Sequence, residues 1–178
     1  MNNRIGIFCS SSDRMEQVFY DEAARLGQWI GQHGRTLVYG GAGCGLMEVL
    51  AKSVHEAGGR VLGVVPKILV EQGRVSRYID ETILTSDLNQ RKQGIIDHSD
   101  VILALPGSVG TLDEVFTVLA ANTIGIYSKQ VLFWNIDGFW DELFAMFHAL
   151  EKRNVVNRPL AGFVHVADTF DEVVRLIG

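Results

Sequence analysis

Residues 101–105 form an uninterrupted apolar run, Val-Ile-Leu-Ala-Leu, which lies between an aspartate and a Pro-Gly turn. A strand this short and this apolar is typical of a parallel sheet that is covered on both faces. Along the rest of the chain, short apolar segments alternate with longer segments in which apolar residues recur at helical spacing. We therefore predict an α/β fold built on a doubly wound parallel sheet with helices on both faces.

The alternation divides the chain into predicted strands and helices. The predicted strands are residues 4–9, 36–39, 60–65, 81–85, 101–105, 131–134 and 163–166, and the predicted helices are residues 15–33, 46–57, 87–98, 111–123, 139–152 and 170–177. Residues 67–77 are expected to form an irregular connection. Neither a linker nor a repeat interrupts the pattern, so residues 1–178 are predicted to form a single Rossmann-like domain.

The composition argues against several classes of partner. The chain has 16 Lys and Arg against 21 Asp and Glu, a net charge of −5, which is unfavourable for a general nucleic-acid or anionic-membrane binder. No apolar run approaches the ~18 residues of a membrane helix, and the N-terminus is too short and strand-like for a signal peptide. Two cysteines and five scattered histidines predict neither a disulfide framework nor a metal site. We expect a cytoplasmic protein that binds no nucleic acid and no membrane.

The loops that follow strands one, two, four and five are the expected ligand site, because ligands bind at the carboxyl ends of the strands in such sheets. After the first strand, Ser10 and Ser11 belong to a serine-rich loop that suits a phosphate group, although a helix N-cap is an equally good interpretation. After the second strand, Gly40, Gly41 and Gly43 allow the backbone to approach a ligand closely. We include all five residues in the predicted ligand site.

The glycine run after the second strand fits neither of the common nucleotide-binding templates. Leu46 stands where the dinucleotide fingerprint requires its third glycine. Leu46 and Met47 also replace the lysine and hydroxyl residue of a Walker A loop. Both observations weaken a nucleoside-triphosphatase or an ordinary NAD-dehydrogenase function. A monophosphate or nucleotide held by backbone amides remains consistent with the run.

A Pro-Gly-x-x-Gly turn ends the fifth strand and precedes a Thr-x-x-Glu pattern. Pro106, Gly107 and Gly110 form a sharp turn that leaves amides free for an anion. Thr111 and Glu114 match a capping box, and the same pattern opens the helix predicted at residues 170–177. The Thr-x-x-Glu pattern alone therefore indicates only a helix start, and the glycine turn is what suggests a site.

The helix predicted at residues 111–123 has apolar residues on two sides. One stripe is expected to face the sheet, so that Glu114 points away from it; this stripe consists of Leu112, Val115, Phe116 and Leu119. A second apolar side predicts contact with another copy of the chain, or burial under the loop at residues 127–129; it consists of Val118, Ala121 and Ile124.

Arg91 and Lys92 occupy apolar positions of the helix predicted at residues 87–98. Leu88, Ile95 and Ile96 mark its apolar face, and the two cations fall at the intervening positions on that face. Buried charges need an anionic partner, because burial is otherwise costly. We favour an anion or a carboxylate as that partner over extension of both side chains to water.

Together these motifs resemble the Lonely Guy (LOG) family. The resemblance is carried by Gly40-Gly41-x-Gly43-x-Gly45-Leu46-Met47, by Arg91-Lys92 and by Pro106-Gly107-x-x-Gly110-Thr111-x-x-Glu114. The family comprises cytokinin riboside 5′-monophosphate phosphoribohydrolases that were long labelled lysine decarboxylases. Arg91 together with Glu114 is the more specific signal, because the glycine motifs are shared with non-catalytic molybdenum-cofactor carrier proteins.

The resemblance implies hydrolysis of the N-glycosidic bond of adenine-type nucleoside 5′-monophosphates to free base and ribose 5-phosphate. It implies no metal or organic cofactor, and a homodimer or larger assembly with sites near the dimer interface. Arg91 and Glu114 would be the catalytic pair, and Gly107, Gly110 and Thr111 would hold the phosphate. Lys92 would add positive potential or a phosphate contact.

Departures from the family pattern and other functions leave alternatives open. Ser108 replaces the usual glycine, and it would be strained if that position needs a positive φ. A non-catalytic carrier would bind a nucleotide or molybdopterin-like ligand in the same loops, but it has no need of a carboxylate facing an anion. An amino-acid decarboxylase needs a Schiff-base lysine, and nothing singles one out. The preferred base is open among adenine, prenylated adenine and other purines.

Overall fold

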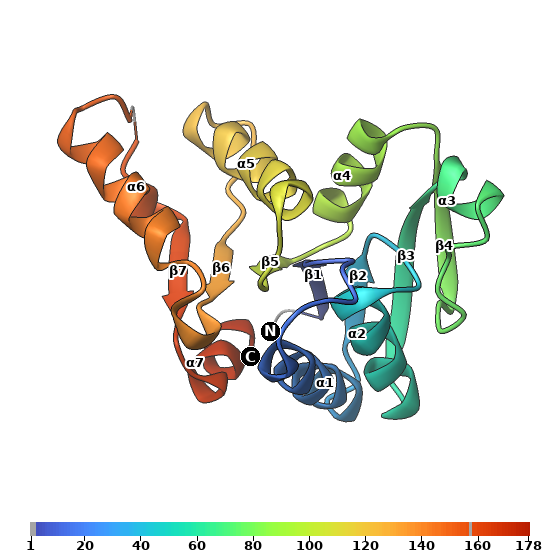
Figure 1. Ribbon diagram of the computed structural model, residues 1–178. Coiled ribbons are helices and arrows are strands. Elements are labelled where there is room, and N and C mark those ends of the chain that lie inside the picture. The colour runs from blue at the N-terminus through green and yellow to red at the C-terminus, as the bar shows by residue number, and fades with distance from the viewer. Residues whose placement is uncertain (1–2, 157) are drawn as a thin grey trace.

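The structure is a computed structural model that describes residues 3–156 and 158–178. Seven strands form one all-parallel sheet in the order β4-β3-β2-β1-β5-β6-β7, which confirms the predicted fold class (Figure 1). The strands are β1 (Arg4–Phe8), β2 (Thr36–Tyr39), β3 (Arg60–Pro66), β4 (Glu81–Thr85), β5 (Val101–Ala104), β6 (Val131–Trp134) and β7 (Val164–Ala167). All four residues of β5 are buried, as its apolar composition predicts.

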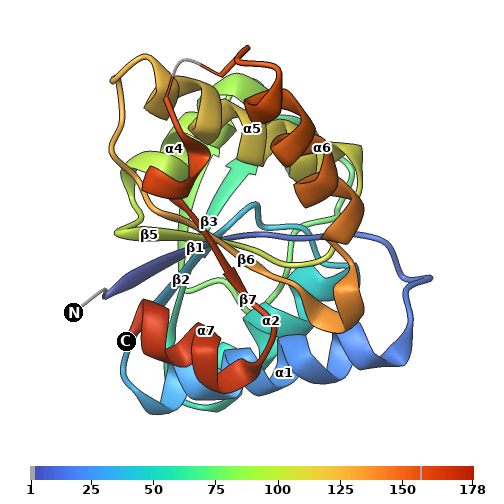
Figure 2. The same cartoon turned by 90° about the vertical axis from the view of Figure 1, so that its left-hand side faces the viewer.

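Helices cover both faces of the sheet, as Figures 1 and 2 show from two directions. Helices α1, α2 and α7 lie on one face, and α4, α5 and α6 lie on the other; a separate hydrophobic cluster fills each interface. The helices are α1 (Gln17–Gln32), α2 (Gly45–Glu56), α3 (Lys67–Glu71), α4 (Leu88–Asp97), α5 (Val109–Thr123), α6 (Asp141–Lys152) and α7 (Phe170–Ile177), with 3-10 turns at Ile136–Gly138 and Leu160–Gly162. In the described part of the chain, no helix combines the length and the apolar character that crossing a membrane requires.

Two local predictions need correction. The connection at residues 67–77 is not wholly irregular, because it begins with the short helix α3. Helix α5 starts at Val109 rather than at residue 111, and its N-cap is Ser108. The Thr-x-x-Glu pattern therefore lies inside α5 and forms no capping box there, whereas the same pattern at Thr169 does form one at the start of α7.

The inward face of helix α5 matches the predicted stripe only in part. Its buried residues are Thr111, Glu114, Val115, Val118, Leu119 and Asn122. Of the predicted stripe, Val115 and Leu119 are buried as expected, but Phe116 is 37% exposed. Glu114, expected to point away from the sheet, is buried in the wall of a cavity. The inward face of α5 becomes polar at its first turns, where it borders a cavity. Of the second apolar side, Val118 belongs to the core and Ile124 is exposed, so contact with another copy at Ile124 stays a prediction.

The strand order reverses between β1 and β5, which are neighbours in the sheet although far apart in sequence. The chain proceeds outward from β1 to β4 on one side and from β5 to β7 on the other. Loops that leave β1 and β5 therefore diverge and leave a crevice at the carboxyl edge, the usual ligand position in doubly wound sheets.

Candidate active site

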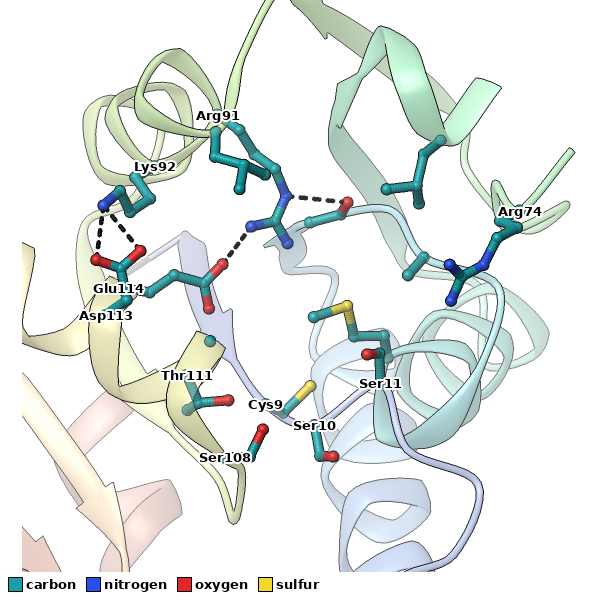
Figure 3. Close-up of a pocket in the computed structure, with 16 residues that line it drawn as sticks. Cys9, Ser10, Ser11, Arg74, Arg91, Lys92, Ser108, Thr111, Asp113 and Glu114 are labelled. Carbon is teal, nitrogen blue, oxygen red and sulfur yellow. Dashed lines mark hydrogen bonds and ion pairs between the residues drawn. The ribbon is translucent and has the colours of Figure 1, made fainter. Parts of the chain in front are cut away.

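A cavity of about 280 Å³ lies at this carboxyl edge. The loops after β1, β2, β4 and β5 contribute to its wall, as predicted, and the connection after β3 contributes as well (Figure 3). Its size suits a small molecule. The structure therefore brings together side chains that are separated by up to about a hundred positions in the sequence.

Arg91 and Glu114 form an ion pair inside the cavity. Helix α4 supplies the arginine and helix α5 the glutamate, and their side chains are only 11% and 6% exposed. Arg91 Nη1 donates to Glu114 Oε1, and Arg91 Nε donates to the Gly40 carbonyl at 3.3 Å. Because little water reaches the pair, each group depends on the other to compensate its charge.

The environment of Glu114 favours proton transfer or the stabilisation of a nearby cation. Burial raises the pKa of its carboxyl above the ordinary value, and the Arg91 guanidinium opposes that shift. A carboxylate with a raised pKa is a stronger base than an exposed one. Burial also raises the pKa of the Cys9 thiol in the cavity wall. That thiol stays neutral and is poorly suited to act as a nucleophile.

Lys92 is held by a second carboxylate of α5. It is 9% exposed, and its Nζ donates to both carboxylate oxygens of Asp113 at 2.9 Å. Carboxylate partners for Arg91 and Lys92 are therefore confirmed, and extension of both side chains to water is wrong. Leu88, expected on the apolar face of α4, is 59% exposed and borders the cavity, whereas both isoleucines of α4 are buried.

Hydroxyl groups occupy the other end of the cavity, where Figure 3 shows Ser10, Ser108 and Thr111 away from Arg91. The Ser10 amide donates to the Pro106 carbonyl at 3.1 Å, which joins the loops after β1 and β5. Gly107 has no room for a Cβ, which would overlap the Thr111 side chain. Ser108 has a φ of −101°, so serine fits this position without strain.

The serine-rich loop does not cap α1, the helix that follows it, but it accepts hydrogen bonds from the start of α2: the Gly45 amide donates to the Asp13 carboxylate at 2.8 Å and the Leu46 amide to the Ser10 carbonyl at 3.0 Å. Helix α1 begins at Gln17 with Glu16 at its N-cap. Ser10 Oγ instead accepts a hydrogen bond from the Ser12 amide at 3.0 Å, and Ser11 lines the cavity. Gly110, in the first turn of α5, also lines the cavity. A serine N-cap for α1 is therefore wrong, and the loop instead satisfies the first amides of α2.

Gly41 and Gly43 hold a neighbouring segment and do not line the cavity. The Gly43 amide donates to the Arg74 carbonyl at 2.8 Å, and the Gly41 carbonyl accepts from the Ser76 amide at 3.0 Å. These bonds flank an antiparallel bridge between the glycine loop and the connection after β3. The Gly43 amide thus already has a protein acceptor. The bridge places Arg74, which no sequence motif marks, in the cavity wall.

Across residues 3–156 and 158–178, no group of three or more His, Cys, Asp or Glu side chains is arranged to hold a metal ion. The charged groups of the cavity wall are Arg74, Arg91, Lys92, Asp113 and Glu114. They offer ionic and hydrogen-bonding contacts to a polar organic ligand.

Comparisons with known proteins place this geometry in a family. Residues 47–177 match the family model described as "Possible lysine decarboxylase". The cytokinin riboside 5′-monophosphate phosphoribohydrolase LOG5 of Arabidopsis thaliana is 39% identical over 140 residues, which cover 79% of this chain and 61% of LOG5. LOG3 of the same plant, with the same activity in its name, is 32% identical over 172 residues, which cover 97% of this chain and 80% of LOG3.

The chain belongs to the LOG family. This confirms the resemblance seen in its glycine, Arg-Lys and Thr-x-x-Glu motifs. The match to LOG5 spans 61%, less than two thirds, of that relative's length.

Solved structures similar to this LOG-family chain include carrier proteins. The molybdenum cofactor binding protein of Rippkaea orientalis has a TM-score of 0.75 and 27% identity, with 99% of this chain and 96% of that chain covered. The Moco carrier protein of Chlamydomonas reinhardtii has a TM-score of 0.76 and 26% identity, with the same coverage. Fold alone therefore does not separate a hydrolase from a carrier.

Proposed function

We propose that this protein hydrolyses the N-glycosidic bond of purine nucleoside 5′-monophosphates, with adenine or an N6-substituted, cytokinin-type adenine as the base. Water adds to C1′ of the ribose, the bond to the base breaks, and the base takes up a proton. The products are the free base and ribose 5-phosphate. The observation that carries the proposal is the buried Arg91–Glu114 ion pair, which faces the hydroxyl-lined end of the cavity.

The hydroxyl-lined end suits the 5′-phosphate. Helix α5 begins there, and the first amides of a helix have no acceptor within it. These amides and the helix dipole favour an anion. Gly110 and Thr111 lie in that first turn, and the hydroxyls of Ser10 and Ser11 are on the facing loop. A phosphate bound there would leave the ribose near the middle of the cavity.

The ion-paired end suits the ribose and the reacting bond. Glycosidic cleavage passes through a state in which the sugar carries positive charge. Glu114 stabilises that charge or orients the attacking water. Arg91 fixes the orientation of Glu114, and its remaining N–H groups are available to sugar hydroxyls.

A ligand carrier is the second candidate, because the carrier proteins have the same fold at 26–27% identity. A carrier requires affinity for its ligand and no chemistry at the sugar. A carboxylate buried in the wall of the cavity is unfavourable for a site that only binds an anion. Glu114 therefore favours the hydrolase.

The substrate assay decides between these functions. Purified protein is incubated with AMP, N6-isopentenyl-AMP and the matching nucleosides, and free base is measured by chromatography. We expect base from the monophosphates, at a rate at least roughly 10- to 100-fold above that from the nucleosides, because charged hydrogen bonds to phosphate contribute to transition-state binding. Ligand binding with no base released from any purine monophosphate would favour the carrier.

Gly40→Ala is expected to lower the rate of base release by roughly 100-fold. A Cβ at this position would overlap the Arg91 guanidinium, which then loses its contact with Glu114. The measurement is turnover of AMP together with thermal unfolding. Gly162→Ala is the matched control, because a Cβ there meets nothing within 4 Å and its rate should be unchanged. Equal rates for both variants would contradict the role of Arg91.

A further inference from the structure

Among the described residues, the cavity wall has one cation that no carboxylate compensates. The wall holds three basic side chains, and two of them are paired with carboxylates of α5. Arg74, the third, has no hydrogen bond or ion pair through its side chain to any described residue, and Figure 3 shows its guanidinium directed toward Ser11. The two cations that the sequence marks as anion partners are therefore already occupied within the protein, and Arg74 supplies the surplus positive charge.

The backbone of Arg74 is fixed although its side chain is exposed to the cavity. Its carbonyl accepts from the Gly43 amide at 2.8 Å, and its amide donates to the Leu69 carbonyl at 3.0 Å. The Ser76 amide is bonded to the glycine loop at 3.0 Å. The position of Arg74 beside the cavity is therefore maintained by main-chain bonds, while the guanidinium keeps its donors for a ligand.

We propose that Arg74 binds the 5′-phosphate of the substrate and makes the site selective for monophosphates over nucleosides. The proposal rests on the function proposed above, because it names the group that recognises the substrate's charge. A phosphate monoester carries about −1.5 to −2 charges at neutral pH. A guanidinium matches its oxygens with paired hydrogen bonds that a lysine does not reproduce. Arg74 lies in the wall of the same cavity as Ser10, Ser11 and Thr111, so its guanidinium would add a charged donor for the phosphate to the hydroxyls and the α5 amides.

Arg77 provides a matched control on the same connection. Its guanidinium donates to the Tyr78 hydroxyl at 2.9 Å and lies 5.0 Å from the centroid of the Tyr78 ring. It is not part of the cavity wall. Replacing either arginine by alanine removes the same charge from the protein, so any difference between the two variants reports on the position of the charge and not on the net charge.

The test measures binding of ribose 5-phosphate and of adenosine to the full chain by calorimetry. Ribose 5-phosphate carries the phosphate but is not cleaved, and Arg91 and Lys92 keep their partners in all proteins compared. For Arg74→Ala we expect affinity for ribose 5-phosphate to fall by roughly 10- to 100-fold, and affinity for adenosine to change by less than about 2-fold. Arg74→Lys should recover part of the loss, and Arg77→Ala should bind both ligands as the unsubstituted protein does.

Three results would overturn the proposal: unchanged affinity of Arg74→Ala for ribose 5-phosphate, an equal loss for adenosine, or an unsubstituted protein that does not bind ribose 5-phosphate. Thermal unfolding of each variant detects a folding defect, which would weaken both ligands together. The test does not depend on catalysis. A protein that releases no base but loses ribose 5-phosphate selectively in Arg74→Ala would refute the hydrolase and retain the phosphate-binding arginine.

Discussion

Glu114→Gln is expected to lower the rate of base release from AMP by about 1,000-fold while the protein stays folded. Glutamine has nearly the same shape, and its side-chain oxygen still accepts a hydrogen bond from Arg91. What is lost is the negative charge that would stabilise the sugar cation or activate water. The measurement is turnover at saturating AMP, with AMP affinity determined in parallel, since a loss confined to turnover places the effect on the chemical step.

Glu172→Gln is the matched control for that variant. Glu172 belongs to the other Thr-x-x-Glu pattern, where its carboxylate accepts from the amides of Asp168 and Thr169 at 3.0 and 3.1 Å. Glutamine also serves in a capping box. The control should keep its activity because α7 lies on the opposite face of the sheet from α5. A Glu114→Gln variant as active as this control would refute the proposed catalytic role.

The sheet was predictable because its physical cause is local. Short strands of four to seven residues, most of them apolar, alternate with segments of helical period. Helices that cover both faces of the sheet bury these strands. The requirement for an anionic partner at Arg91 and Lys92 was predictable for a similar reason, because cations on an apolar helix face must be compensated. The identity of Asp113 as the partner of Lys92 was not, because it depends on how α4 and α5 approach each other.

The errors at α5 have two origins. The pattern at residues 111–114 matches a capping box, but the helix starts two residues earlier at Val109. The second origin is the assumption that polar residues such as Glu114 lie on the outer face of the helix, which places Phe116 on the inner face instead. A helix that borders a polar cavity carries polar residues on its inward face in its first turns, and local spacing does not distinguish these from a solvent-facing surface.

Arg74 was unpredictable because long-range pairing positions it. The connection after β3 shows no regular period, and it reaches the cavity through an antiparallel bridge between Ala42 and Val75. The glycine run indicates that another group approaches its backbone closely, and a ligand was the expected group. At Gly41 and Gly43, the group that approaches is the backbone of the connection after β3. The glycine run thus contributes to the cavity indirectly, because it binds the segment that carries Arg74.

Arg91→Ala is expected to destabilise the folded protein by about 3–5 kcal/mol at pH 8, in addition to abolishing most of the activity. It leaves Glu114 buried without its cation. Burial raises the pKa of Glu114 already in the native protein, and Arg91 opposes that shift, so the variant's pKa rises further. At a pH between the pKa of Glu114 in the unfolded chain and its higher pKa in the folded protein, the folded protein keeps a proton on Glu114 that the unfolded chain releases. Stability therefore falls as the pH rises through that range, and the deficit should be smaller at pH 5 than at pH 8.

Urea unfolding at the two pH values measures this effect, and a double variant isolates its cause. Adding Glu114→Gln to Arg91→Ala removes the uncompensated carboxylate, so we expect about 2 kcal/mol of stability to return at pH 8 and the pH dependence of the deficit to disappear. The double variant stays inactive, which separates stability from catalysis.

Arg60→Ala breaks an ion pair with Glu81 whose side chains are 72% and 59% exposed, and it should cost at most about 1 kcal/mol at either pH. A deficit in Arg91→Ala that is equal at both pH values and unrelieved in the double variant would mean that the arginine stabilises the fold through packing against Gly40 and not through its charge.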